Sequence, residues 1–237
     1  MRLARRGGKV YPLVILAKLF IAGIVNLGTM PAAANAAEVG PRPVRVWPQI
    51  WVEPASDDAR RVANWVAASG DNGNLPYVIV DKIDAKVFVF HASGQLRGAA
   101  RALLGAARGD DSSPGIGSRL LALIRPEERT TPAGRFIAAL GNDLGENDVL
   151  WVDYDTAISL HRVIIGNPGD NRLERLGTNS ALNKRISYGC INVPVRFYED
   201  VVHPAFAGTH GIVYILPEQR RLEDVFPLSK PLVRAKR

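Results

Sequence analysis

The sequence predicts a mainly β fold with a few short helices. Two runs rich in β-branched and aromatic residues, Tyr77–Asp81 and Lys86–Phe90, are separated by a polar turn, which is typical of a β-hairpin. Runs of similar character recur along the chain and are expected to extend the sheet; they are residues 136–140, 149–153, 157–162 and 212–216. No internal repeat or heptad pattern indicates another architecture.

A short helix is expected before the hairpin, over residues 59–68. Ser56 is suited to cap its N-terminus, and two aspartates follow in the first turn, where the helix dipole favours negative charge. Residues 70–74 end the helix as a turn. They resemble a calcium loop in composition but lack the carboxylate at the final ligand position.

Three later segments complete the expected elements. Residues 96–107 are rich in Ala, Leu and Arg, which favours a helix. Residues 109–118 form a predicted loop that lacks the Gly-Lys-Ser/Thr ending of a phosphate-binding loop, which argues against nucleotide binding. A short helix is expected over residues 195–202, with Pro194 suited to its first turn.

Residues 1–36 have the features of a secretory signal peptide. They combine basic residues, an apolar run over 11–27 and an Ala-x-Ala ending, after which we expect cleavage. An uncleaved inner-membrane anchor is the alternative, but Lys18 interrupts the run, which is short for a span of about 20 residues. The sequence therefore predicts an exported protein.

Most of the net charge belongs to this segment. It holds five of the 30 basic residues and none of the 23 acidic ones, so its removal lowers the formal net charge from +7 to +2. The remaining 201 residues suffice for one domain with a sizeable core. They contain no basic cluster interleaved with aromatics, which argues against nucleic-acid binding.

Cys190 is the only cysteine of the chain, and it lies in the string Ser-Tyr-Gly-Cys-Ile-Asn over residues 187–192. A single thiol in an exported protein has no intramolecular disulfide partner, so it is either buried and inert or chemically used. Gly189 favours a chemical role for the thiol, because it permits a tight turn whose backbone N–H groups face a developing oxyanion. His161 ends an apolar stretch upstream and is the candidate base that would ionise the thiol.

Together with His161, this string resembles the signature of the L,D-transpeptidase catalytic domain family, in which a histidine precedes Ser/Thr-His-Gly-Cys-hydrophobic-Asn/Arg. Five of the six motif positions match. Residues 131–136 resemble the family's Thr-Pro-x-Gly-x-Phe segment and precede the histidine in the expected order. The resemblance implies the β-sandwich-like catalytic fold of that family, with a strand-bearing segment near residues 96–107.

The resemblance covers residues 75–217 and divides the chain into four parts. Residues 1–36 are the signal peptide, and 37–74 form an N-terminal extension that carries the short helix. Its proline-rich part, up to residue 54, holds two tryptophans and is expected to be extended and packed on the domain. Residues 218–237 are charged and are interpreted as a solvated tail.

Two features depart from the family's pattern. Tyr188 occupies the place of a second histidine, and its phenol carries no charge near neutral pH, so the help of an imidazolium is lost. The 25 residues 162–186 separate His161 from the motif, whereas the family's gap is usually in the mid-teens. Residues 167–171 are rich in turn formers, so we expect the extra length to bulge out as a loop.

The resemblance assigns a role to each site residue. Cys190 is the nucleophile and His161 the general base, with its second ring nitrogen oriented by the backbone carbonyl of Arg162. The backbone N–H groups of Tyr188, Gly189 and Cys190 are expected to form an oxyanion hole. Ser187 and Asn192 are expected to order the loop, and direct substrate contact by these two and by Arg162 is the alternative.

The implied activity is transfer of a peptidoglycan stem peptide through a Cys190 thioester in the periplasm, without a cofactor. The acceptor is another stem, a lipoprotein lysine or, in an L,D-carboxypeptidase, water. The rival hypothesis is a peptidoglycan-binding scaffold that has lost turnover, motivated by Tyr188 and the long gap. The other histidines lack cysteine or carboxylate partners at ligand spacing, so no metal site is predicted.

Overall fold

The computed structural model describes residues 54–143 and 148–228. The predicted signal peptide, the proline-rich segment before residue 54 and the last nine residues of the tail lie outside the described residues. Within them the mainly β class is confirmed, and the helices are few and short. No helix in this part of the chain has the length and apolar character needed to span a bilayer.

The strands are β1 (Tyr77–Asp81), β2 (Lys86–Phe90), β3 (Leu96–Arg101), β4 (Leu104–Gly105), β5 (Gly134–Asn142), β6 (Asp148–Asp153), β7 (Ile158–Arg162), β8 (Arg185–Ser187), β9 (Ile191–Val193) and β10 (His210–Ile215). The helices are α1 (Asp57–Ser69), α2 (Arg172–Gly177), α3 (Val195–Phe197), α4 (His203–Phe206) and α5 (Leu222–Val225). A π-helical turn (Tyr198–Val202) joins α3 to α4. Short 3-10 turns lie at Ile116–Ser118, Leu121–Leu123, Pro126–Glu128, Pro168–Asp170 and Leu182–Lys184.

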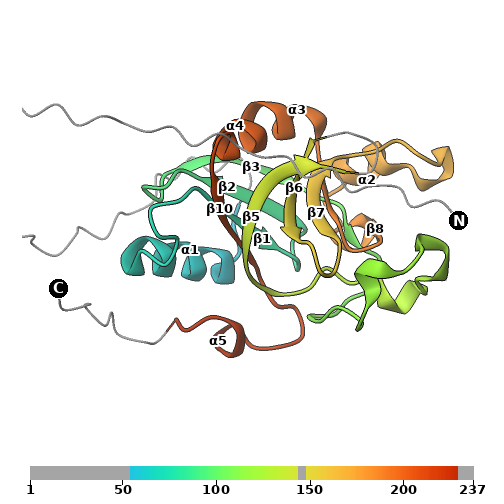
Figure 1. The fold of residues 1–237 in the computed structure, drawn as a ribbon, viewed down its shortest axis with the longest axis horizontal. Helices are drawn as coiled ribbons and strands as arrows, with labels where there is room; N and C mark the ends of the chain where they lie inside the picture. The colour runs from blue at the N-terminus through green and yellow to red at the C-terminus, as the bar shows by residue number, and fades with distance from the viewer. Residues whose placement is uncertain (1–53, 144–147, 229–237) are drawn as a thin grey trace, which may run out of the picture. The chain divides into compact units, whose positions relative to one another are not determined.

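Eight strands form one mixed sheet in the order β3-β2-β1-β10-β5-β6-β7-β9. Two pairs are parallel, β1 with β10 and β7 with β9, and the other neighbours are antiparallel. The short strands β4 and β8 form a separate parallel pair. Figure 1 shows α1 and α5 on one side of the sheet and α3 and α4 on the other.

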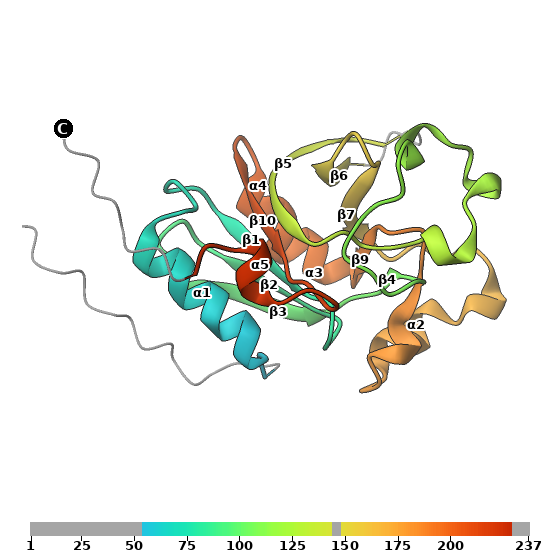
Figure 2. The ribbon, with the colours of Figure 1, turned by 90° about the horizontal axis from the view of Figure 1, so that it is seen from below.

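The two faces of the sheet bury two separate apolar clusters. Tyr77 and Ile79 of β1 face a cluster that also contains the buried residues of α1 and α5. Val78 and Val80 point the other way, because side chains alternate along a strand, and join residues of β6, β7 and β9. The strongly curved sheet, visible in Figure 2, therefore encloses the second cluster as a sandwich would.

Helix α1 forms as its sequence predicts. Ser56 Oγ accepts a hydrogen bond from the Ala59 N–H at 3.1 Å, and Gly70 ends the helix at φ 69°. Residues 70–74 form a turn, as expected.

The helix that composition favours over residues 96–107 is wrong, and the strand-bearing segment that the resemblance implies there is confirmed, because this segment forms β3 and β4. Phe88 of β2 lies opposite Ala99, and a Cβ at Gly98 would lie 3.1 Å from a Val201 methyl. Small residues let the strand approach the helical segment behind it, so packing outweighs helix propensity. Pro194 also differs from the expectation, since it caps α3 rather than occupying its first turn.

The solvated-tail interpretation is wrong for residues 218–228. Leu222 and Phe226 are buried in the α1 cluster, with exposures of 4% and 1%. The Glu218 side chain is fully buried and pairs with Arg185 of β8 at 2.6 Å. This part of the tail belongs to the domain core.

Candidate active site

The loop between β8 and β9 carries Cys190 and is held by its own side chains. The Ser187 hydroxyl accepts from the Gly189 N–H at 3.1 Å and donates to the Cys190 carbonyl at 2.6 Å. Asn192 Nδ2 donates to the same carbonyl at 3.2 Å. Ser187 and Asn192 are both buried, and these contacts order the loop.

Gly189 adopts a backbone conformation that other residues avoid. Its φ is +130°, and a Cβ there would lie 2.7 Å from both the Thr130 carbonyl oxygen and Ile158 Cδ1. The Gly189 carbonyl in turn accepts from Thr131 Oγ1 at 2.7 Å, and that hydroxyl accepts from the Gly105 N–H at 2.9 Å. The loop is therefore fixed against the segment before β5.

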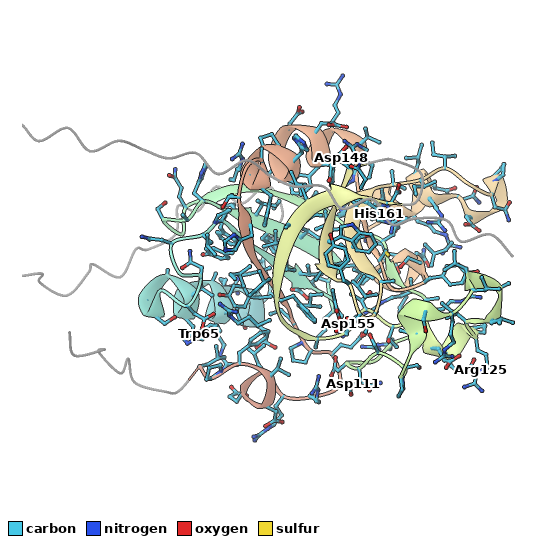
Figure 3. The ribbon with its side chains drawn as sticks, viewed as in Figure 1. Trp65, Asp111, Arg125, Asp148, Asp155 and His161 are labelled. Carbon is cyan, nitrogen blue, oxygen red and sulfur yellow. The ribbon has the colours of Figure 1, made fainter. Side chains whose placement is uncertain are left out.

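Parallel pairing of β7 with β9 brings the histidine to the cysteine. Leu160 lies opposite Ile191 and His161 opposite Asn192, so Cys190, just before β9, lies beside Ser159 and two residues along β7 from His161. His161 Nδ1 lies 2.7 Å from the Arg162 carbonyl oxygen, the contact that the resemblance implied. A carbonyl only accepts, which assigns the Nδ1–H tautomer to the neutral ring and leaves Nε2 free to take a proton. Figure 3 labels His161 on β7.

The surroundings of the Cys190 thiol favour its ionised form. Burial raises the pKa of the half-buried thiol. The hydrogen bond and the charge of His161 lower this pKa, Ser159 adds to the lowering, and together these effects are larger than that of burial. The net result is a pKa below the ordinary thiol value. Ser159 Oγ lies 3.6 Å from Cys190 Sγ.

Sequence reasoning missed Ser159 and underrated Thr131. Ser159 is two residues before His161, so strand alternation places both on one face of β7, a signal that was readable in the sequence. Thr131 begins the segment compared with Thr-Pro-x-Gly-x-Phe, for which no contact with the nucleophile loop was predicted. In the structure its buried hydroxyl links Gly105 to the nucleophile loop.

Two expected roles need correction. The Gly189 N–H already donates to Ser187 Oγ, so within the expected oxyanion hole the Tyr188 and Cys190 amides are the better candidates. The Arg162 guanidinium is held away from a substrate role. It donates to the Asp148 carboxylate at 3.0 Å, pairs with Glu199 and lies over the ring of Tyr198.

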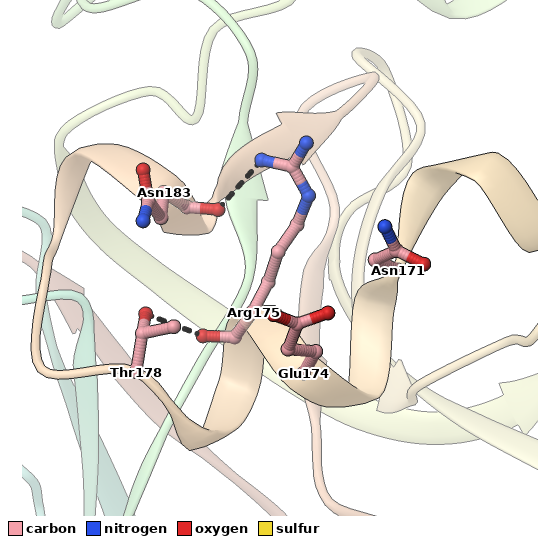
Figure 4. Close-up of a pocket in the computed structure, with 5 residues that line it drawn as sticks. All are labelled: Asn171, Glu174, Arg175, Thr178 and Asn183. Carbon is pink, nitrogen blue, oxygen red and sulfur yellow. Dashed lines mark hydrogen bonds between the residues drawn. The ribbon is translucent and has the colours of Figure 1, made fainter.

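The extra length between His161 and the motif forms α2 and the turns around it. Arg172 at the start of α2 donates to Asn192 Oδ1 at 3.2 Å, so the insertion contacts the motif directly. A pocket of about 210 Å³ lies in the insertion and is drawn in Figure 4; its lining residues are Asn171, Glu174, Arg175, Thr178 and Asn183. None of these is a candidate nucleophile or base, so this pocket is distinct from the cysteine site.

The remaining histidines take ordinary positions. His91 is exposed after β2, His210 is exposed at the start of β10, and His203 lies 3.8 Å from an Asp148 oxygen. Among the described residues, no group of three or more His, Cys, Asp or Glu side chains is arranged to hold a metal ion.

No family model matches this chain, and no curated protein does. Among solved structures, it is similar to the helical cell shape determining protein Pgp2 from Campylobacter jejuni, with a TM-score of 0.42 and 15% identity, over 66% of this chain and 55% of that one. It is also similar to the catalytic domain from the E. faecium L,D-transpeptidase, with a TM-score of 0.31 and 17% identity, over 59% of this chain and 95% of that one. The chain thus spans about half the length of Pgp2, and the function proposed below rests on the site itself.

Proposed function

We propose that this protein is an exported L,D-transpeptidase that acts on peptidoglycan stem peptides through a Cys190 thioester. The observation that carries the proposal is the arrangement at β7 and β9: the Arg162 carbonyl orients His161, and His161 lowers the pKa of the Cys190 thiol. A buried, inert cysteine would lack this activating partner. The signal-peptide pattern of residues 1–36 supports export and a periplasmic location.

In the first half-reaction, the Cys190 thiolate attacks the carbonyl carbon of the amide that follows the third stem residue. The negative charge on the carbonyl oxygen is stabilised by the amides of Tyr188 and Cys190. The C–N bond then breaks, and His161, protonated at Nε2, donates that proton to the leaving nitrogen of the terminal D-alanine. The products are a thioester on Cys190 and free D-alanine.

In the second half-reaction, an acceptor amine attacks the thioester while neutral His161 takes its proton. The new amide forms as the C–S bond breaks, which returns the thiolate and imidazolium pair. An amine on a second stem gives a cross-link, and a lipoprotein lysine gives protein attachment. Water in the same position gives L,D-carboxypeptidase activity.

The first experiment is the intact mass of residues 37–237 after incubation with a carbapenem, whose ring the family's thiol is expected to open. The expected result is one adduct with the added mass of the whole carbapenem, on the wild type and not on Cys190→Ala. Absence of the adduct from folded protein with an alkylatable thiol would support the binding scaffold instead. Incubation with stem tetrapeptides, followed by product masses, then identifies the acceptor.

The role of His161 predicts the pH dependence of thiol reactivity. Because the pKa of Cys190 is lowered, the wild type should react with iodoacetamide at pH 6 faster than a free cysteine, whose pKa is about 8.5. His161→Gln removes the partner, so its reactivity should appear only at higher pH. Rate profiles from pH 5 to 9 measure both, and superimposable profiles would contradict the base assignment.

A further inference from the structure

The Arg129 side chain lies over the ring of Tyr188, the residue that departs from the family's motif. The Arg129 guanidinium carbon is 4.0 Å from the centroid of the Tyr188 ring, a cation–π contact. Tyr188 is two residues before the nucleophile, and both side chains are half-buried. A positive charge therefore lies where the motif's histidine is absent.

No carboxylate of the described residues pairs with this arginine. Its Nε and Nη2 both donate to one acceptor, the Ile124 carbonyl, at 3.3 and 3.1 Å. The nearby Glu128 is already held by Arg119 at 2.8 Å and by Arg125 at 3.1 Å. A half-buried guanidinium with a single neutral acceptor is poorly compensated, and an anionic ligand would complete its contacts.

The backbone of Arg129 is fixed to the same structure that holds the nucleophile loop. Its carbonyl accepts from the Ala107 N–H at 3.0 Å and lies 2.3 Å from the position that a Cβ on Gly105 would take. Two residues later, Thr131 bonds to the Gly189 carbonyl. The backbone that carries this charge is thus fixed relative to the nucleophile loop.

We propose that Arg129, seated on Tyr188, is an anion-binding residue that receives the terminal carboxylate of the acyl donor peptide. The identity of the carboxylate rests on the proposed function: the leaving D-alanine carries it one residue beyond the scissile carbonyl, close to the sulfur. Arg129 then supplies, by a fixed charge, electrostatic help that Tyr188 cannot give. A carboxylate matches the fork of donors on a guanidinium.

The site is tested without any peptide by comparing two alkylating reagents at Cys190. Iodoacetate is an anion and iodoacetamide is neutral. The Cys190 thiolate attacks the CH2 carbon of either reagent and displaces iodide, so the ratio of their rates cancels any change in the thiol pKa. We expect Arg129→Gln to lower the iodoacetate to iodoacetamide ratio about three- to tenfold at low salt, and Arg129→Lys to retain most of it. An unchanged ratio in folded Arg129→Gln overturns the proposal.

Arg196→Gln is the matched control, since it removes one exposed positive charge from α3 and should leave the ratio unchanged. An equal fall in this variant would assign the effect to net charge and overturn the proposal. Tyr188→Phe keeps the aromatic face and should keep the ratio.

Donor peptides with a free or an amidated terminus then test the carboxylate. Arg129→Gln should raise KM for the peptide with a free carboxylate about tenfold or more and leave KM for the amidated peptide nearly unchanged. Equal effects on both peptides overturn the assignment of the carboxylate. If the wild type processes neither peptide, the proposed function fails, whereas the reagent ratio still decides whether Arg129 binds anions.

Discussion

At the scale of single residues, the site depends on a few short contacts around Cys190. Ser187 holds the loop from within, and Thr131 holds it from outside. Gly189 makes both possible, because its conformation and its lack of a side chain let the loop lie against Thr130 and Ile158. Ser187 and Gly189 of the motif around Cys190 therefore shape the loop, in addition to any part they play in the chemistry of the thiol.

Gly189→Ala should therefore damage the site and the fold together. Its Cβ would meet a backbone oxygen and a methyl carbon at 2.7 Å, at a φ that L-residues rarely adopt. We expect a loss of roughly 1–3 kcal/mol in unfolding free energy and at least a tenfold slower acylation of Cys190. Urea unfolding and adduct formation measure the two effects. Gly166→Ala is the control, since a Cβ there meets nothing within 4 Å; equal losses in both variants would contradict the argument.

At the scale of elements, the site lies where several segments meet. Strands β7 and β9 supply the base and the nucleophile, while β4 and the segment before β5 hold the loop through Thr131. The insertion contributes Arg172, which bonds to Asn192. Figures 1 and 2 show α2 and the segment between β4 and β5 extending beyond the same end of the sheet.

Thr131→Val tests the tie between these elements. The change removes a buried hydroxyl and leaves the Gly105 N–H and the Gly189 carbonyl without that partner. We expect a cost of about 1–3 kcal/mol and slower acylation of Cys190. Thr131→Ser keeps the hydroxyl and should lose about 1 kcal/mol or less, with acylation near the wild-type rate. Thermal unfolding and adduct kinetics compare the two variants. A valine variant as reactive as the serine variant would contradict the proposed role of the Thr131 hydroxyl in holding the nucleophile loop.

At the scale of the whole molecule, a buried ion cluster joins the tail to the site. Lys82 Nζ, after β1, contacts Asp110 at 2.8 Å, Glu218 at 3.6 Å and the Thr131 carbonyl at 2.9 Å. Arg185 of β8 completes the cluster on Glu218. The hairpin, the segment before β5, the tail and the strand that leads into the nucleophile loop are thereby fixed together.

This cluster predicts how stability depends on pH. Burial raises the pKa of Asp110, but Lys82 and the backbone N–H groups of residues 218–220 outweigh it and lower the pKa to about 2. A lowered folded-state pKa stabilises the fold above the unfolded value near 4, and that contribution is lost as the pH falls from about 4 to 2. Asp110→Asn should therefore cost about 2 kcal/mol at pH 7 and progressively less below pH 4.

Urea unfolding at pH 7, 4 and 3 measures this difference between wild type and Asp110→Asn. Asp155→Asn is the control, because it removes the charge of an exposed carboxylate outside this cluster. A cost for Asp110→Asn that stays constant with pH would show that its charge does not matter.

The sequence by itself determined the local elements and the chemistry of the site residues. The hairpin, α1 with its Ser56 cap and the later strands follow from periodicity and capping, which depend on neighbouring residues. The motif around Cys190 and the preceding His161 pointed to a nucleophile and a base. The structure brings these two residues together through β7 and β9, with the predicted carbonyl on His161 Nδ1.

Only the tertiary structure decided the features that depend on contacts between distant segments. Composition favoured a helix over residues 96–107, but β3 and β4 form there and Gly98 packs closely against Val201. Residues 218–228 belong to the core because Glu218 and Phe226 contact residues far away in the chain. Arg129 on Tyr188 belongs to the same class of contact. The physical reason is that burial and charge pairing are set by the folded neighbours of a residue, which local sequence patterns do not specify.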